Sequence, residues 1–145
     1  MNGGNQSTFL RFGLVALVAL LALGAPSAPA SAQTVSINPD GTVTKGVATV
    51  TGTFSALIGT PPMGLTVGLD VQVMQFRHGQ VSASASTRLG PVTADGSTQT
   101  WTATMFSAAG FKTGEAQVNV RLFDARNNFE YTLAVAGAIV QLHAH

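Results

Sequence analysis

Polar and apolar residues alternate strictly from Thr100 to Phe106 (TWTATMF). Trp101, Ala103 and Met105 alternate with three threonines, and a period of two places the two sets on opposite faces of an extended strand. Trp101 is the only tryptophan, and burial of so large a ring dominates the energy of a small core. We therefore expect a sheet protein whose core is built around Trp101.

The same two-residue period recurs along the rest of the chain after Leu23. It is found in residues 34–38, 42–44, 47–57, 65–76, 81–89, 116–124 and 129–142. Turn-forming residues separate these segments roughly every 8–12 residues, and no helical period is present among them. We predict an all-β fold, an antiparallel immunoglobulin-like β-sandwich of seven or eight strands. A closed barrel is the alternative, because the pattern does not fix how a sheet closes.

The pattern also predicts faces, edges and turns for individual segments. Asp70 falls on the outward face of 65–76, and the weakly apolar segment 81–89, with Val81 inward, is expected at a sheet edge. The dipeptide Gly90-Pro91 should begin a loop. In 129–142, Tyr131, Leu133, Val135 and Ile139 are in register on one face, and Gly137 suggests a bulge. Both faces are apolar after Gly137, so the inner face is left open there.

Residues 1–32 have the pattern of a signal peptide, which leaves a domain of residues 33–145. An apolar run from Phe12 to Leu23 follows Arg11, and small residues at Ala30 and Ala32 fit an A-x-A cleavage site. The run is about a dozen residues long, whereas a bilayer span needs about 20. We expect a hydrophobic signal-peptide helix, cleavage after Ala32, and a secreted, extracellular or periplasmic protein that meets a membrane only before cleavage. An uncleaved membrane anchor is the alternative.

Charge and cysteine content exclude some classes of partner and of stabilisation. Without Arg11, six Lys and Arg residues balance six Asp and Glu residues, and the chain has no cysteine. A neutral domain has no basic field to attract nucleic acid, so we expect no nucleic-acid partner. An exported fold without cysteine must be held by its core alone.

The sequence contains no recognisable catalytic or cofactor motif. His143 and His145 could share one strand face and hold a metal, but they lie at the end of the chain, where fraying is common, so no metal site is predicted. The tripeptide 112–114 (KTG) lacks the S-x-x-K and S-D-N motifs that accompany it in β-lactam enzymes. The acidic residues lie in turns, at strand ends or, for Asp70, outward in mid-strand. We therefore expect a protein that is not an enzyme and binds no cofactor.

Three phenylalanines break the polarity of their surroundings. Phe106 and Phe123 fall on faces assigned to solvent, and Phe111 lies in a glycine-rich loop. Exposed aromatic residues gathered on one face would form a binding patch. The alternative is that a loop covers them as a small satellite core.

Several short motifs resemble those of a known family. Residues 35–43 (VSINPDGTV) followed by 50–54 (VTGTF), the Asp95-Gly96 turn before Trp101, and the segment from Phe111 to Val118 are similar to motifs of small secreted bacterial immunoglobulin-like β-sandwich domains of unknown function. Such domains commonly carry paired cysteines, so this chain would be a cysteine-free variant. The resemblance implies a fold and no catalytic residue.

These observations favour a secreted, non-enzymatic module for binding, adhesion or attachment to the cell envelope. Its partner would be a protein or an envelope component. The alternative is a small secreted hydrolase or inhibitor whose site lies on the loop 58–64 or 107–114. A pilin-like subunit would need a longer N-terminal strand to donate than residues 33–38 provide.

Overall fold

The computed structural model describes residues 33–57, 65–126, 128 and 130–145. These residues form eight strands and no helix, which confirms the all-β prediction. The strands are β1 (Thr34–Ile37), β2 (Asp40–Thr44), β3 (Val47–Ser55), β4 (Leu65–Arg77), β5 (Gln80–Ala94), β6 (Gln99–Phe106), β7 (Gly114–Asp124) and β8 (Thr132–Ala144). The predicted signal peptide, residues 1–32, lies outside the described residues. Within the described ranges, no helix is long and apolar enough to cross a membrane.

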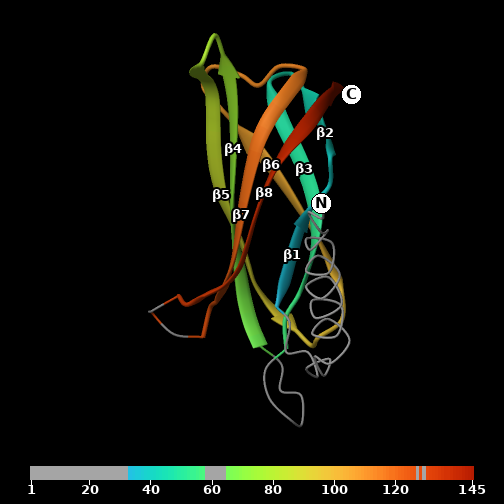
Figure 1. Cartoon of the computed structure of the whole chain (residues 1–145), viewed down its shortest axis with the longest axis vertical. Helices are drawn as coiled ribbons and strands as arrows, with labels where there is room; N and C mark the ends of the chain where they lie inside the picture. Colours follow the sequence, from blue (N-terminus) through green and yellow to red (C-terminus); the bar gives the residue numbers. More distant parts are fainter. Residues whose placement is uncertain (1–32, 58–64, 127, 129) are drawn as a thin grey trace, which may run out of the picture. The chain divides into compact units, whose positions relative to one another are not determined.

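All eight strands belong to one mixed sheet (Figure 1). Its hydrogen-bonded path runs β6–β3–β2–β8–β7–β4–β5. The remaining strand, β1, also pairs with β3, next to the part of β3 that pairs with β2. The pair β2–β8 is parallel and the other pairs are antiparallel, so the expectation of a wholly antiparallel fold is wrong at this one junction.

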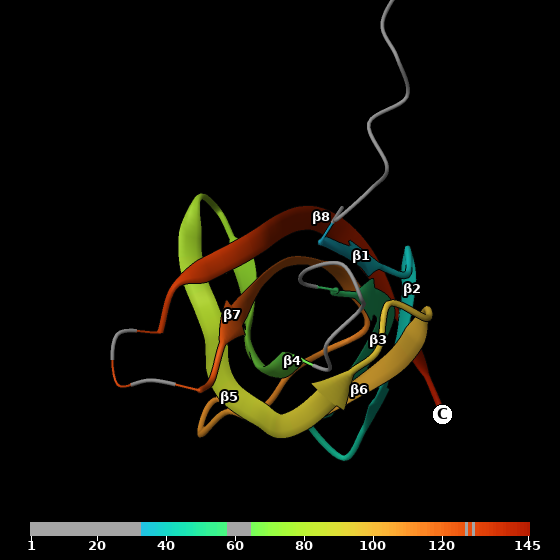
Figure 2. The same ribbon diagram turned by 90° about the horizontal axis from the view of Figure 1, so that it is seen from below.

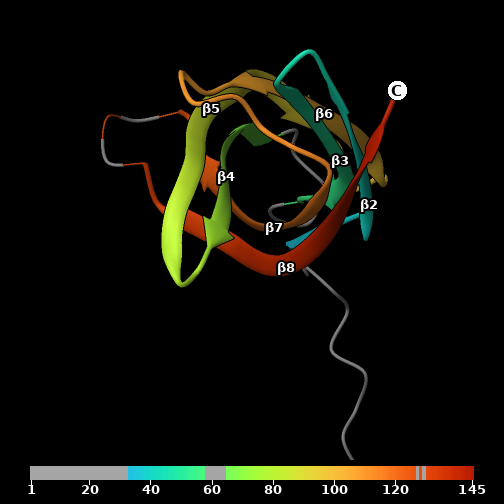
Figure 3. The same ribbon diagram turned by 90° about the horizontal axis from the view of Figure 1, so that it is seen from above.

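Viewed along the strands, the sheet curls around its core until its two ends meet (Figures 2 and 3). The end strands β5 and β6 lie next to each other, and Gln99 Nε2 donates to the carbonyl of Thr93 at 3.0 Å across this seam. No backbone ladder between β5 and β6 is found in the described residues, so the seam is not closed as a barrel would be.

Trp101 lies in the core as predicted. It is 4% exposed, and its indole Nε1 donates to the carbonyl of Ser36 on β1 at 3.1 Å. The ring packs over Gly52, where an added Cβ would lie 2.6 Å from the ring and 2.0 Å from the Ser36 carbonyl oxygen. A close approach of ring and backbone therefore requires glycine at this position. Every second residue is buried from Ala48 to Phe54, from Leu65 to Gln75, from Trp101 to Met105 and from Ala116 to Leu122, as the two-residue period predicts.

Two of the hairpins turn on a dipeptide that ends in glycine. Both residues of Lys45-Gly46 and both of His78-Gly79 have positive φ angles, 49° and 83° in the first turn and 51° and 76° in the second. This is the backbone of a type I′ turn, whose twist matches that of the paired strands. Both turns lie in the gaps that separate the alternating segments of the sequence, at residues 45–46 and 77–80.

The edge segment 81–89 differs in part from its prediction. The strand β5 does end the hydrogen-bonded path, as expected, but it continues past Gly90-Pro91 to Ala94. A shift in its register with β4 accommodates these two residues, so they do not begin a loop. Val81 is exposed.

In the first part of β8 the inward face differs from the predicted one, although Leu133 does pack against the core. The buried residues Val118 and Val120 of β7 pair with Ala138 and Ala136, so the even-numbered residues of β8 point inward. Val135 is consequently 71% exposed, and Tyr131 and Ile139 are exposed too. The prediction relied on the larger apolar side chains, whereas pairing with β7 determines which residues of β8 face the core. Gly137 lies in regular register opposite Asn119, so no bulge occurs there.

The outer surface of β1, β3 and β6, called the hydroxyl face below, is covered by serine and threonine side chains. Many of them bond to one another across strands: Ser36 Oγ lies 2.7 Å from Thr53 Oγ1, and Thr49 Oγ1 lies 3.2 Å from Thr104 Oγ1. Such cross-strand pairs stabilise a solvent-facing sheet.

Candidate functional site

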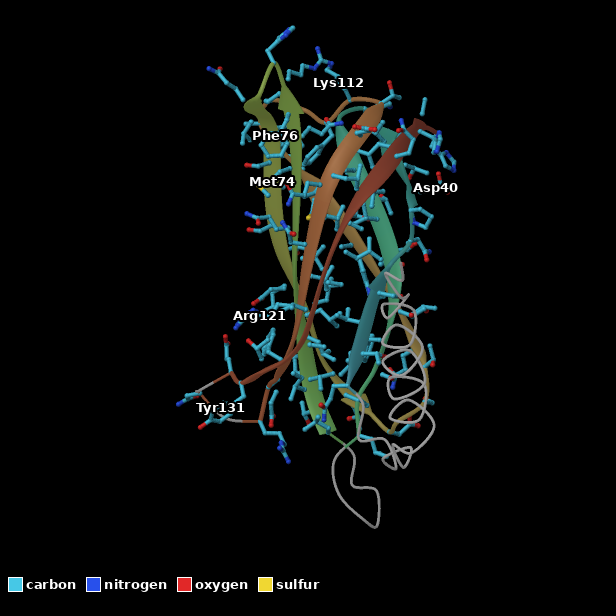
Figure 4. All side chains as sticks on the ribbon, viewed as in Figure 1. Asp40, Met74, Phe76, Lys112, Arg121 and Tyr131 are labelled. Atoms are coloured by element: carbon cyan, nitrogen blue, oxygen red, sulfur yellow. The ribbon has the colours of Figure 1, made fainter. Side chains whose placement is uncertain are left out.

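Four charged side chains gather on the outer surface of β5, β4, β7 and β8, called the cluster face below. Asp70 of β4 lies in register with Arg88 of β5 on one side and with Arg121 of β7 on the other, and Glu130 comes from the segment before β8. Because all three strand residues occupy outward positions of adjacent strands, the two-residue period brings them together. We call these four residues the ion cluster. Figure 4 shows Arg121 on the side of the ribbon away from Asp40.

In the ion cluster, each arginine donates hydrogen bonds to both carboxylates. Arg88 Nε donates to Asp70 Oδ1 at 2.7 Å, and Arg88 Nη1 donates to Glu130 Oε1 at 2.5 Å. Arg121 Nη2 donates to the other oxygen of Asp70 and lies 3.4 Å from Glu130 Oε2. Two carboxylates and two guanidinium groups therefore cancel in charge, and both arginines are already engaged with protein acceptors.

The electrostatics of the cluster keep its carboxylates ionised. Burial alone would raise the pKa of Asp70, but hydrogen bonds from Arg88 and Arg121 outweigh it and lower that pKa below its usual value. The hydrogen bond from Arg88 also lowers the pKa of Glu130. A general acid needs its pKa raised toward neutrality, so these shifts run in the wrong direction for that role.

Phe123, one of the three phenylalanines of the predicted patch, lies beneath the ion cluster. The guanidinium carbons of Arg88 and Arg121 lie 4.6 and 5.0 Å from the centre of its ring, in cation–π geometry. The ring rests on Gly68, where an added Cβ would be 2.4 Å from the Phe123 Cζ atom. Phe123 does point to the outer surface, but the arginines leave it only 3% exposed.

The other two phenylalanines differ in solvent exposure. Phe111 is buried, and its backbone N–H donates to the carbonyl of Gly46 at 2.9 Å. Phe106 is 69% exposed at the end of β6. Phe106, Phe111 and Phe123 therefore do not form one exposed patch. Phe111 belongs to the main core, and Phe123 is covered by arginine side chains and not by a loop, so the satellite-core alternative does not describe them either.

A hollow of about 380 Å³ lies beside the ion cluster on the same face. Its floor is one row of residues in register across four strands: Ser86, Gln72, Asn119 and Gly137. Asp70 and Arg121 line one side, together with Val135 of β8. We call it the cross-strand hollow. The sequence does not predict it, because its residues come from four segments whose order in the sheet a local pattern does not reveal.

A second hollow, of about 340 Å³, lies on the other side of the ion cluster. Arg88, Pro91, Phe123, Arg126 and Glu130 are among the residues that line it. The neighbouring Asp124, expected in a solvated turn, is in fact buried; hydrogen bonds from Arg126 lower its pKa.

The loop 107–114, the alternative catalytic position, is held down by a buried glutamine. Gln75 Nε2 donates to the carbonyl of Lys112 at 2.7 Å, and the Lys112 N–H donates to Gln75 Oε1 at 2.8 Å. A hollow of about 170 Å³ beside this loop is lined by Arg77, Ser82, Ala109, Gly110 and Lys112. Ser82 Oγ donates to the carbonyl of Gln75, so its proton is bonded to a backbone acceptor and not to a general base. The loop 58–64 lies outside the described residues.

The histidines considered for metal binding lie at the far side of the sheet. His143 Nε2 is 2.8 Å from Asp40 Oδ1, and both residues are exposed, as is His145. In the part of the chain that the structure describes, no group of three or more metal-ligating side chains is present.

No protein-family model matches this sequence, and none of the curated proteins matches it. The resemblance to the secreted β-sandwich family therefore stays a prediction, and the function must be argued from the site.

Proposed function

We propose that this chain is an exported, non-enzymatic binding module that attaches to a component of the cell envelope through its cluster face. The observation that carries the proposal is the cross-strand hollow: an uncommitted polar surface lying beside a charge-balanced ion cluster. Fixed side chains on paired strands provide a rigid platform, which suits binding without rearrangement.

We also propose that the architecture is immunoglobulin-like. The pairing of β3 with β6, of β4 with β7 and β5, and of β7 with β8 supports this view. The first two short strands add to it, because β1 pairs with β3 and β2 then crosses to pair in parallel with β8. Long-range pairs of this kind are typical of Greek-key sandwiches.

The electrostatics support binding in preference to catalysis. Each carboxyl group with a shifted pKa, at Asp70, Asp95, Asp124 and Glu130, has it lowered by hydrogen bonds. None of these four groups is poised as a proton donor near neutral pH. Export is supported by the sequence pattern of residues 1–32.

Co-sedimentation with an isolated cell-envelope fraction of the producing organism tests this proposal. The purified full chain should sediment with the envelope and stay in solution without it. Ser86→Arg places a bulky cation in the cross-strand hollow and should weaken binding by about tenfold or more. Thr102→Arg places the same side chain on the hydroxyl face and should leave binding unchanged. The proposal fails if the wild-type chain stays in solution with the envelope, or if the two variants sediment alike.

A further inference from the structure

The floor of the cross-strand hollow carries two amide side chains that form no hydrogen bond with the described residues. They are Gln72 of β4 and Asn119 of β7, which lie opposite each other in register and both line the hollow. Adjacent strands are about 4.8 Å apart, so the two amides offer donors and acceptors at that spacing. Ser86, next in the row, adds a hydroxyl that is equally unengaged among the described residues.

The hydroxyl face provides an internal comparison. There, Ser36 bonds to Thr53 and Thr49 bonds to Thr104, so much of the polar surface is satisfied across strands. In the hollow, the Gln72 and Asn119 amides are in register yet do not bond to each other. Their hydrogen-bonding capacity is thus available to a ligand that can displace surface water.

The charge at the rim of the hollow selects against an ionic ligand. Asp70 and Arg121 line the hollow, and the ion cluster to which they belong sums to zero charge. A phosphate or carboxylate would have to compete with Asp70 and Glu130 for the arginines, and a cation would have to compete with the arginines for the carboxylates. A neutral ligand meets no such competition.

The shape of the hollow comes from the short residues in the row. Asn119 Oδ1 lies 3.0 Å from where a Cβ on Gly137 would be, so the amide leans over the glycine. A side chain at position 137 would crowd the amide and narrow the hollow. The exposed Val135 forms an apolar wall on the same strand.

We propose that the cross-strand hollow binds a neutral saccharide. Paired hydroxyl groups of a sugar ring both donate and accept hydrogen bonds, as amide groups do, and the C–H face of the ring can pack on Val135. This assignment rests on the proposed function and specifies its ligand: the envelope component would be recognised by its neutral glycan portion.

Side-chain amide signals in a ¹⁵N-correlation NMR spectrum of the full chain test the assignment directly. The probes are neutral hexasaccharides of β-1,4-linked glucose, α-1,4-linked glucose, β-1,4-linked mannose and β-1,4-linked N-acetylglucosamine, with hexagalacturonate as the charged comparison. We expect at least one neutral probe to shift the Gln72 and Asn119 NH₂ signals with a Kd on the order of 0.1–1 mM. Hexagalacturonate should not shift them.

Two variants make the test specific to the hollow. Gly137→Val places a branched side chain against the Asn119 amide without removing a polar group, and it should weaken binding at least about tenfold. Gln117→Ala, on the neighbouring row of β7 outside the lining, should stay within about twofold. The assignment is overturned if no neutral probe shifts the two amides, if hexagalacturonate shifts them equally, or if Gly137→Val binds like wild type. Envelope binding that is abolished by protease treatment of the envelope and insensitive to Gly137→Val would also overturn it, while the proposed function would stand with a protein as partner.

Discussion

Replacing Trp101 by alanine should be among the most damaging single changes in the described part of the domain. The ring is almost wholly buried and packs on Gly52, and its N–H donates to Ser36 at 3.1 Å. Deleting a buried tryptophan side chain costs about 3–5 kcal/mol, and the carbonyl that loses its donor adds to that cost. A domain of about 110 residues has a free energy of unfolding of roughly 5–15 kcal/mol, so the loss is a large part of the total.

Urea unfolding followed by far-ultraviolet circular dichroism measures this effect, because the variant has no tryptophan left to fluoresce. With a urea m value of about 2 kcal/mol/M, the midpoint should fall by about 2 M. Trp101→Phe keeps an aromatic ring and loses the indole donor, so we expect an intermediate loss of about 1–3 kcal/mol.

Thr102→Ala is the matched control, since this exposed neighbour on β6 should change stability by no more than about 0.5 kcal/mol. A loss below about 1 kcal/mol for Trp101→Ala would refute the reasoning, because it would mean that the ring is not part of the core.

Three further changes probe the rest of the structure. Gln75→Leu should cost about 1–3 kcal/mol and speed hydrogen exchange at the Lys112 amide; unchanged exchange would show that the loop is held by other contacts. Asp70→Asn should cost at most about 1 kcal/mol at pH 7, because its pairs are partly exposed. The folded-state pKa of Asp70 lies below the unfolded value, so this contribution is present above about pH 4 and is lost on acidification through the folded pKa. Urea unfolding should therefore show the gap between wild type and Asp70→Asn narrowing as the pH falls below about 4, and a constant gap would contradict the electrostatic account. Gly68→Ala forces a Cβ into the Phe123 ring and should cost about 1–3 kcal/mol, but clearly less in a Phe123→Ala background; equal costs in both backgrounds would rule out this contact.

The alternating pattern predicts the strands well because it reports directly on which residues are buried. It places Trp101 in the core and Asp70 outside it, and both assignments are confirmed. It fails for β8, where apolar residues occur on both faces and only pairing with β7 decides the parity. The pattern therefore places Tyr131 and Val135 on the inward face, although both face solvent, and it leaves the inner face after Gly137 open.

The candidate site is much less predictable than the strands. The pattern places Arg88 and Arg121 outward, but nothing in the sequence shows that they flank Asp70 on adjacent strands. The sequence wrongly suggests that Phe123 is exposed, because the two arginines that cover its ring come from different strands. The cross-strand hollow depends on Gly137 lying opposite Asn119, a relation between distant segments that a local pattern does not contain.

The parallel junction of β2 and β8 has a mechanical consequence. Asp40 to Val43 run alongside Gln141 to Ala144, and the Gln141 N–H donates to the Pro39 carbonyl at 2.8 Å. Tension applied between the segment before β1 and the segment after β8 would slide these two strands past each other lengthwise. Their hydrogen bonds would then have to rupture together rather than one by one, so the fold should resist stretching far better than a hairpin peeled open from its end.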